Sequence, residues 1–166
     1  LMLKSGCASL TAYLYLKRFV RDPEYAVIGG LLYAFSGFSV YNIFFNHFHE
    51  VIVFFPLLLI GLEEAMTEGK RGRFALAITV NAMVNYWFFI GEVFFVAFYF
   101  LVRFTDPKWR LSVRKFLSLA VEAVLGMGLA MVAFLPSVLA VMGNPRTTAD
   151  NLLLGPSLWY YSNPQR

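Results

Sequence analysis

The sequence predicts an all-α protein, a polytopic transmembrane helical bundle with about five or six membrane passes. Hydrophobic residues make up 59% of the 166-residue chain and charged residues only 14%. A typical soluble domain has about 25% charged residues, and a soluble chain of this size needs more polar surface to cover its core. The apolar residues form long unbroken runs, unlike the short alternating segments of a membrane β-barrel.

The positive charge of the chain is typical of membrane loops. The net charge is +4, but most basic residues cluster in short linkers between apolar runs, so no nucleic-acid partner is expected. The single cysteine, Cys7, excludes an internal disulfide. The sequence begins and ends abruptly, so we expect residues 1–166 to be a single transmembrane region and an internal fragment of a larger membrane protein.

The first two expected helices cross in opposite directions. The first covers residues 1–16 and leads into KRFVRDPEY, whose basic residues favour the cytoplasmic side. The second covers about 25–45 and places residues 46–50 outside. It carries a stripe of small residues at every fourth position, which lets another helix approach closely. These residues are Ala26, Gly30 and Ala34.

A third helix, about 51–66, returns to a second basic loop, and we expect Pro56 to kink it. The stretch 74–104 is either one long span or two short passes. A single span would place the five basic residues of RFTDPKWRLSVRK outside, whereas two passes keep them inside. We therefore favour a hairpin of two halves of about 14 residues each, with NYWFFIGE (Asn85, Gly91 and Glu92) at its apex.

The last expected span covers about 116–142 and contains Pro136, a second expected kink. Its small residues are expected to pack against another helix; they are Gly126, Gly128 and Ala130. Residues 143–166 then form an extracytoplasmic segment whose aromatic residues suit a membrane interface.

Two ionisable residues inside the apolar segments are candidate functional groups, because such residues are costly in a membrane. Lys4 lies near the outer end of the first helix, where it either holds a phosphate or extends to the interface. Glu92 lies near the expected apex of the hairpin, where it either faces a cavity or caps a short helix.

The segment HFHE contains three further candidates, His47, His49 and Glu50. We expect a polar outer turn or the mouth of a pocket for a polar substrate. Two splayed rings and one carboxylate are a weak set of ligands, so no metal is expected. Arg146 lies on the same side and suits a phosphate or sugar phosphate. Phosphate-loop, dinucleotide, GxSxG and CxxC motifs are absent from the sequence, and no cofactor is expected.

Several segments occur in a recognisable order: LKSGCASLTAYLYLKR, GGLLYAFSGFSVYN, FFPLLLIGLEEAM, KRGRFALAITVNAMVNYWFFIGEVFF and FLPSVLAVMGNPRT. Together they resemble the bacterial YfhO-type membrane protein family over nearly the whole chain. The most specific parts are YAFSGF, residues 33–38, and PLLLIGLE, residues 56–63.

The resemblance implies a GT-C-like glycosyltransferase in the bacterial cell membrane. Such an enzyme moves a sugar from a polyprenyl-phosphate donor to an envelope polymer, such as a teichoic acid, or to another glycoconjugate on the outer face. Its catalytic acidic residue usually lies in the first extracytoplasmic loop, which we expect upstream of residue 1. The fragment itself would hold the phosphate through Lys4 and Arg146, and its outer polar cluster would line the acceptor mouth.

Two other functions stay open. A transporter or flippase of an amphiphilic envelope precursor would also suit the intramembrane residues Lys4 and Glu92. A structural membrane subunit without activity is the third. The outer position of most uncharged and acidic polar residues favours the transferase, because a transporter needs such groups near the middle of the membrane.

Overall fold

The computed structural model describes residues 2–45, 47–109 and 112–142. This part of the chain contains helices and no strand, which confirms the all-α prediction for these residues. Contacts within the chain divide it into two units, residues 1–130 and 131–166. The described part of the second unit is the last stretch of one helix.

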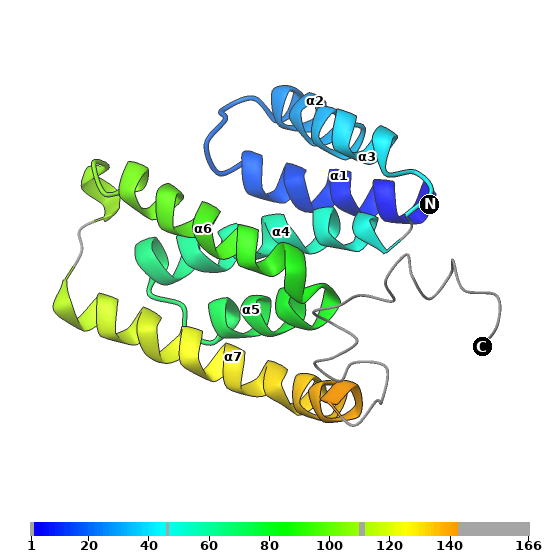
Figure 1. Ribbon diagram of the computed structural model, residues 1–166. Coiled ribbons are helices and arrows are strands. Elements are labelled where there is room, and N and C mark those ends of the chain that lie inside the picture. Colours follow the sequence, from blue (N-terminus) through cyan, green and yellow to red (C-terminus); the bar gives the residue numbers. More distant parts are fainter. Residues whose placement is uncertain (1, 46, 110–111, 143–166) are drawn as a thin grey trace. The chain divides into compact units, whose positions relative to one another are not determined.

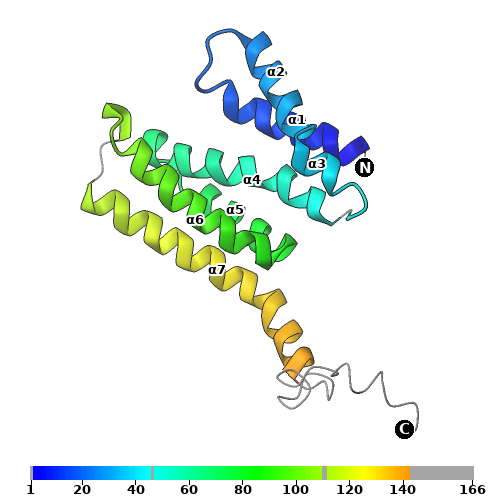
Figure 2. The same ribbon diagram turned by 45° about the horizontal axis from the view of Figure 1, so that its top comes forward.

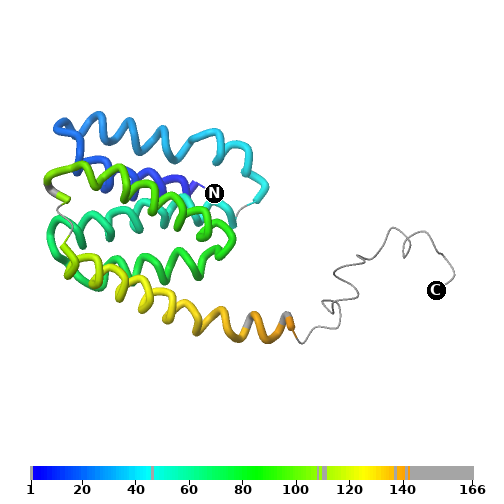
Figure 3. Tube along the Cα trace, turned by 60° about the vertical axis from the view of Figure 1, so that its left-hand side comes forward, coloured from blue at the N-terminus to red at the C-terminus, as the bar shows by residue number. Residues whose placement is uncertain are grey.

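The helical elements follow one another through short turns. They are α1 (Met2–Leu16), α2 (Pro23–Ala34), α3 (Gly37–Tyr41), α4 (Phe48–Glu63), the π-helical η1 (Glu64–Glu68), α5 (Arg73–Val84), α6 (Tyr86–Arg103), the 3-10 turn η2 (Pro107–Trp109) and α7 (Val113–Met142). In the first unit, α1, α2, α4, α5 and α6 run back and forth along a similar direction (Figures 1 and 3).

Small residues bring α1 and α2 together. Ala26, Gly30 and Ala34 are all buried, which confirms the predicted packing stripe. A Cβ atom on Gly30 would lie 2.6 Å from the carbonyl oxygen of Ser9 in α1. The two backbones therefore approach as closely as only a glycine permits, the usual geometry of helix pairs in lipid.

The single helix expected over residues 25–45 is wrong, because the helix breaks between α2 and α3. Ser36 has extended backbone angles, φ −62° and ψ 163°, and is the N-cap residue of α3. Serine favours this position over a helix interior, and the following Gly37 has a low helix propensity. The break is therefore local chemistry inside an otherwise apolar run.

The expected third helix begins earlier and ends earlier than its apolar run. Helix α4 starts at Phe48, continues past Pro56 and ends at Glu63, after which the chain winds as the π-helical η1. The turn that follows contains two glycines with positive φ, Gly69 at 68° and Gly72 at 85°. Other residues rarely adopt this conformation, so the two glycines allow the tight turn into α5.

The stretch 74–104 forms two helices, α5 of 12 residues and α6 of 18, as the hairpin hypothesis predicts. The break lies at Asn85, whose backbone is extended and whose side-chain oxygen accepts hydrogen bonds from Trp87 N at 3.2 Å and Phe88 N at 3.4 Å. Asn85 thus caps α6. Gly91 and Glu92 lie within α6, so their predicted place at the apex is wrong. Figure 2 shows α5 and α6 as separate helices.

The first part of α7 packs against α5 within the first unit. A Cβ atom on Gly126 would lie 2.5 Å from the carbonyl oxygen of Ala75, and Thr79 Oγ1 donates to Gly126 O at 2.9 Å. Gly126 and the fully buried Ala130 are therefore packing positions, as predicted. Gly128 is not, because a Cβ atom there would meet nothing within 4 Å.

Two described helices are long and apolar enough to cross a membrane. They are α6, Tyr86–Arg103, and Val113–Ala140 of α7, whereas Arg73–Val84 is a shorter apolar helix. Helices α1 and α4 have 15 and 16 residues, just below the usual range of about 17 to 25 for a spanning helix. Membrane association is supported, and the number of passes stays a prediction.

Candidate functional site

Charged residues of several loops converge on one end of the helices, called here the basic end (residues 17–22, 63–73 and 103–109). Glu64 accepts hydrogen bonds there from Arg18 Nη2 at 2.5 Å and from Arg73 Nη1 at 2.7 Å. The Glu64 side chain is only 4% exposed. One buried carboxylate therefore ties the end of α1 to the start of α5.

The neighbouring Glu63 is buried among four donors. Arg103 donates to both of its carboxylate oxygens, from Nε at 2.8 Å and from Nη2 at 3.1 Å, and Trp109 Nε1 donates at 2.9 Å. Tyr99 OH donates to the same carboxylate. A buried charge with this many donors is fully solvated by the protein, so Glu63 fixes structure.

The surroundings of Glu64 favour its charged form. Burial alone would raise the pKa of this carboxyl, but hydrogen bonds from Arg73 and Arg18, together with their charges, hold the pKa below its ordinary value of 4.5. Hydrogen bonds from Lys70 and Arg18 likewise lower the pKa of the exposed Glu68. The basic end is thus an ion-pair network that is charged at neutral pH.

The same ion pairs close the hairpin of α5 and α6. Arg73 begins α5 and Arg103 ends α6, and they bind the adjacent carboxylates Glu64 and Glu63. Both ends of the stretch 73–103 therefore lie at the basic end, and Asn85 lies at the other. Lys115 of α7 joins them by donating to Met66 O at 2.8 Å. Glu63 and Glu64 were not among the candidates from the sequence, although two adjacent acidic residues at the end of an apolar run could have indicated an ion-pair network there.

The opposite end carries the residues that the sequence marked as candidates. Lys4 Nζ forms an ion pair with Glu50 Oε1 at 2.7 Å, which joins α1 to α4. His49 is 1% exposed, and its Nε2 lies 3.0 Å from Ser39 O. His47 is exposed, and its ring contacts the Phe48 ring with centroids 4.4 Å apart. The two histidine rings therefore have different surroundings.

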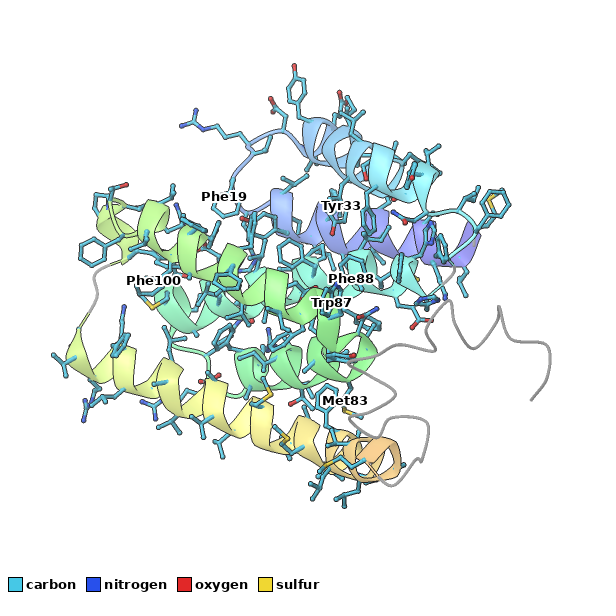
Figure 4. All side chains as sticks on the ribbon, in the orientation of Figure 1. Phe19, Tyr33, Met83, Trp87, Phe88 and Phe100 are labelled. Carbon is cyan, nitrogen blue, oxygen red and sulfur yellow. The ribbon has the colours of Figure 1, made fainter. Side chains whose placement is uncertain are left out.

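A pocket of about 330 Å³ lies near this opposite end and contains the last described candidate, Glu92. Its walls come from α2, α3, α4 and α6 and the turn between α2 and α3. The lining residues are Tyr33, Ser36, Phe38, Val51, Ile52, Phe55, Phe88, Gly91, Glu92 and Phe95. Figure 4 shows two of these aromatic side chains, Tyr33 and Phe88, away from Phe19 of the basic end and from Phe100 near the end of α6.

Glu92 is the acidic group of this apolar pocket. The residue is 7% exposed, and within the described part of the chain its Oε2 atom has no hydrogen-bond partner. A buried carboxylate oxygen without a donor is costly, since it has lost water without a replacement. The pocket is therefore suited to a ligand that combines an apolar body with a hydroxyl donor.

The structure brings only some of the predicted site residues together. Lys4 and Glu50 form one pair, and the two residues that directly follow Glu50, Val51 and Ile52, line the Glu92 pocket. His49 is buried but is not among the residues that line the pocket, and Arg146 lies outside the described residues. The aromatic wall could not be recognised in the sequence, because its residues come from separate helices and the 18 phenylalanines are spread along the chain.

Comparisons with known proteins give one family. The sequence model of the family described as "Bacterial membrane protein YfhO" matches residues 1–163. A relative from Bacillus subtilis (strain 168), named "Uncharacterized protein YfhO", is 26% identical over 129 residues, which cover 68% of this chain. The chain spans 14% of that relative's length. No solved structure matches the chain.

Proposed function

Because the chain belongs to the YfhO family of bacterial membrane proteins, we propose that it is part of a membrane glycosyltransferase. The enzyme moves a sugar from a polyprenyl-phosphate donor to a cell-envelope polymer, such as a teichoic acid, or to another glycoconjugate. The observation that supports this most is the apolar Glu92 pocket, which lies beside the end that carries the Lys4–Glu50 pair. We further propose that this end, with residues 46–50 and 143–166, faces the outside of the bacterial membrane.

The pocket has the properties that a lipid-linked sugar requires. Its volume of about 330 Å³ lies within the usual range for small-molecule sites, and its aromatic walls suit a polyprenyl chain. The unpartnered oxygen of Glu92 can accept a hydrogen bond from a hydroxyl of the sugar or of the acceptor. Glu92 would thereby orient one substrate and gain the donor that it lacks.

Lys4 is the described cation at the same end. Its ammonium is bound to Glu50, and its side chain is 26% exposed. A phosphate that reaches it would compete with a partly exposed carboxylate, whose ion pair contributes little to stability. In this role Lys4 binds the phosphate of the donor, and Glu50 holds Lys4 in place between turnovers.

Sugar transfer is then a nucleophilic substitution at the anomeric carbon of the donor sugar. The acceptor hydroxyl oxygen forms the new bond to that carbon, and the carbon–oxygen bond to the lipid phosphate breaks. The leaving polyprenyl phosphate takes the bonding electrons, and the hydroxyl proton passes to a carboxylate base. The proposal gives the described residues the task of binding and orienting the substrates.

One observation favours the second function, a transporter or flippase of an amphiphilic envelope precursor. Glu92 lies inside α6, one of the two helices long enough to cross a membrane. Ionisable residues in such helices commonly line ion or substrate pathways. A flippase would move the intact lipid-linked precursor past Glu92 and leave its sugar–phosphate bond unbroken.

A transfer assay separates the two functions. The full-length protein is reconstituted in vesicles with polyprenyl-phosphate sugars and a crude envelope acceptor, and acceptor-dependent release of polyprenyl phosphate is measured. We expect release, and we expect Glu92→Gln to slow it by roughly tenfold or more, because the carboxylate acceptor is lost. Glu68→Gln, which removes an exposed carboxylate at the basic end, is the matched control and should transfer normally.

Two results would contradict the proposal. Folded Glu92→Gln protein that transfers sugar at the control's rate would remove Glu92 from the site. Absence of release with several sugars, together with movement of a labelled intact precursor across the vesicle membrane, would establish the transporter instead.

A further inference from the structure

We propose that a second pocket, at the basic end, binds the headgroup phosphate of an anionic membrane phospholipid. This pocket has a volume of about 200 Å³ and lies between the turn after η1 and the first turns of α7. Its lining residues are Ala65, Gly69, Lys70, Arg71, Arg114, Lys115, Ser118, Leu119 and Glu122. The proposal does not depend on the glycosyltransferase activity, since none of these residues lines the Glu92 pocket.

The lining contains four cations and one carboxylate. Lys70 and Arg71 come from the turn between Gly69 and Gly72, whereas Arg114 and Lys115 come from the start of α7. Two segments more than 40 residues apart in sequence therefore bring their positive charges to one cavity. Basic cavities between membrane helices are a common way to bind anionic headgroups.

Two of the four cations already have partners. Lys70 Nζ pairs with Glu68 Oε2 at 2.7 Å, and Lys115 Nζ donates to Met66 O at 2.8 Å. Arg71 and Arg114 are exposed, and within the described part of the chain neither has an ion-pair partner. Their guanidinium groups are thus available to a phosphate, which they can bind with two parallel hydrogen bonds each.

Glu122 opposes an anion, but its position limits the effect. It is 6% exposed, and its Oε2 lies 3.4 Å from Ala75 N of α5, a weak contact with the helix backbone. Four cations line the pocket, and Glu122 is the one carboxylate among its described lining residues. A phosphate therefore meets Arg71 and Arg114 before it comes near Glu122.

The surroundings of the pocket favour a lipid over a free phosphate. The apolar residues next to Arg114 are exposed: Val113 by 76%, Phe116 by 54% and Leu117 by 57%. They lie at the start of the span candidate Val113–Ala140. A lipid can place its phosphate in the basic pocket and its acyl chains along this apolar surface, whereas a free anion gains only the first contact.

Lipid binding to the full-length protein tests the proposal. Native mass spectrometry with phosphatidylglycerol, and with phosphatidylcholine as the neutral comparison, gives the Kd of each lipid. Each cation near an anionic lipid contributes about a fivefold factor. The double variant Arg71→Gln/Arg114→Gln should therefore raise the Kd for phosphatidylglycerol by roughly 30-fold and leave that for phosphatidylcholine unchanged.

The matched control removes two positive charges from the same end but away from the pocket. It is Lys17→Gln/Arg21→Gln, and its Kd for phosphatidylglycerol should stay close to that of the unmodified protein. Unfolding midpoints in phosphatidylcholine nanodiscs establish that both double variants are folded. An equal loss of binding in the two variants would overturn the proposal, because only general surface charge would then be involved.

Inorganic phosphate distinguishes the source of the anion. Added at the same concentration as the lipid in a phosphatidylcholine background, it should not raise the unfolding midpoint. Phosphatidylglycerol should raise the midpoint of the unmodified protein and of the Lys17→Gln/Arg21→Gln control, and raise that of Arg71→Gln/Arg114→Gln less. A rise produced equally by inorganic phosphate would overturn the assignment to a lipid.

Discussion

Glu63, Glu64 and Glu92 are all buried carboxylates, but their neighbours assign them different roles. Arginines bind the first two at 2.5–2.8 Å, whereas Glu92 has an oxygen without a donor in the described part of the chain. A buried charge that is fully hydrogen-bonded holds structure, and an unsatisfied one marks a place where a ligand can add a bond. The residue type alone does not separate these roles.

Replacing Glu63 by glutamine tests its structural role. The amide keeps the size of the side chain but removes the buried carboxylate that binds Arg103, which among the described residues then keeps only its ion pair with Asp106 at 2.6 Å. We therefore expect a loss of roughly 3 kcal/mol in the free energy of unfolding. The thermal midpoint in detergent measures the loss. Glu68→Gln is the control and should change the midpoint little, since that side chain is exposed. Equal midpoints for the two variants would remove Glu63 from the structural network.

Acidification tests Glu64. Its pKa is lower in the folded protein than its ordinary value of 4.5, so the unfolded chain binds a proton more readily. The stability that Glu64 provides is therefore complete above the unfolded pKa and is lost as the pH falls through the folded pKa. As the pH is lowered below about 4.5, we expect the thermal unfolding midpoint to decrease, and to decrease less in Glu64→Gln. The same pH dependence in both proteins would contradict this.

At the scale of the elements, small and polar residues decide where helices pack and break. The spacing of Ala26, Gly30 and Ala34 was sufficient to predict the contact between α1 and α2. The break at Ser36 could not be predicted from hydropathy, because the apolar run continues through it. The same holds for Asn85, where loop charges predicted a hairpin but only the cap identifies the residue that breaks the helix.

Gly30 is the sharpest test of helix packing. A Cβ atom there would lie 2.6 Å from a backbone oxygen of α1, so Gly30→Ala must move one helix, and we expect a loss of about 1–3 kcal/mol. Gly128→Ala is the matched control, because a Cβ atom there meets nothing within 4 Å. Its midpoint should hold or rise slightly, since alanine favours a helix more than glycine does. A stable Gly30→Ala protein would contradict the close contact.

For the whole molecule, the alternation of charged and apolar segments predicted the arrangement of the basic loops better than it predicted the candidate site. The basic loops were expected on one side, and Arg18, Arg73, Arg103 and Lys115 do meet at one end. Lys4 and Glu92 were selected because ionisable groups are rare in such helices, and Glu50 was selected as part of the polar segment HFHE. The pocket around Glu92 could not be predicted, because its walls come from four helices whose contacts depend on breaks that the sequence does not mark clearly.

Labelling of single cysteines tests how the chain crosses the membrane. In a Cys7→Ala background, His47→Cys should react with a membrane-impermeant maleimide in intact cells, and Arg71→Cys only after permeabilisation. His47 is suited to this because it is exposed, whereas a cysteine at His49 would be shielded at 1% exposure. Arg21→Cys is the second inner position and the control. Reaction of His47→Cys only after permeabilisation would reverse the proposed orientation.

The Glu63–Arg103 pair also has a consequence for the order of membrane insertion. Glu64 finds Arg18 in a segment that the ribosome has already made, but Arg103 follows Glu63 by 40 residues. Until those residues are synthesised, the Glu63 carboxylate has no guanidinium and must stay in water. We therefore expect the end of α4 to reach its final position only after α6 has been made, so that assembly of this end of the protein is late and cooperative.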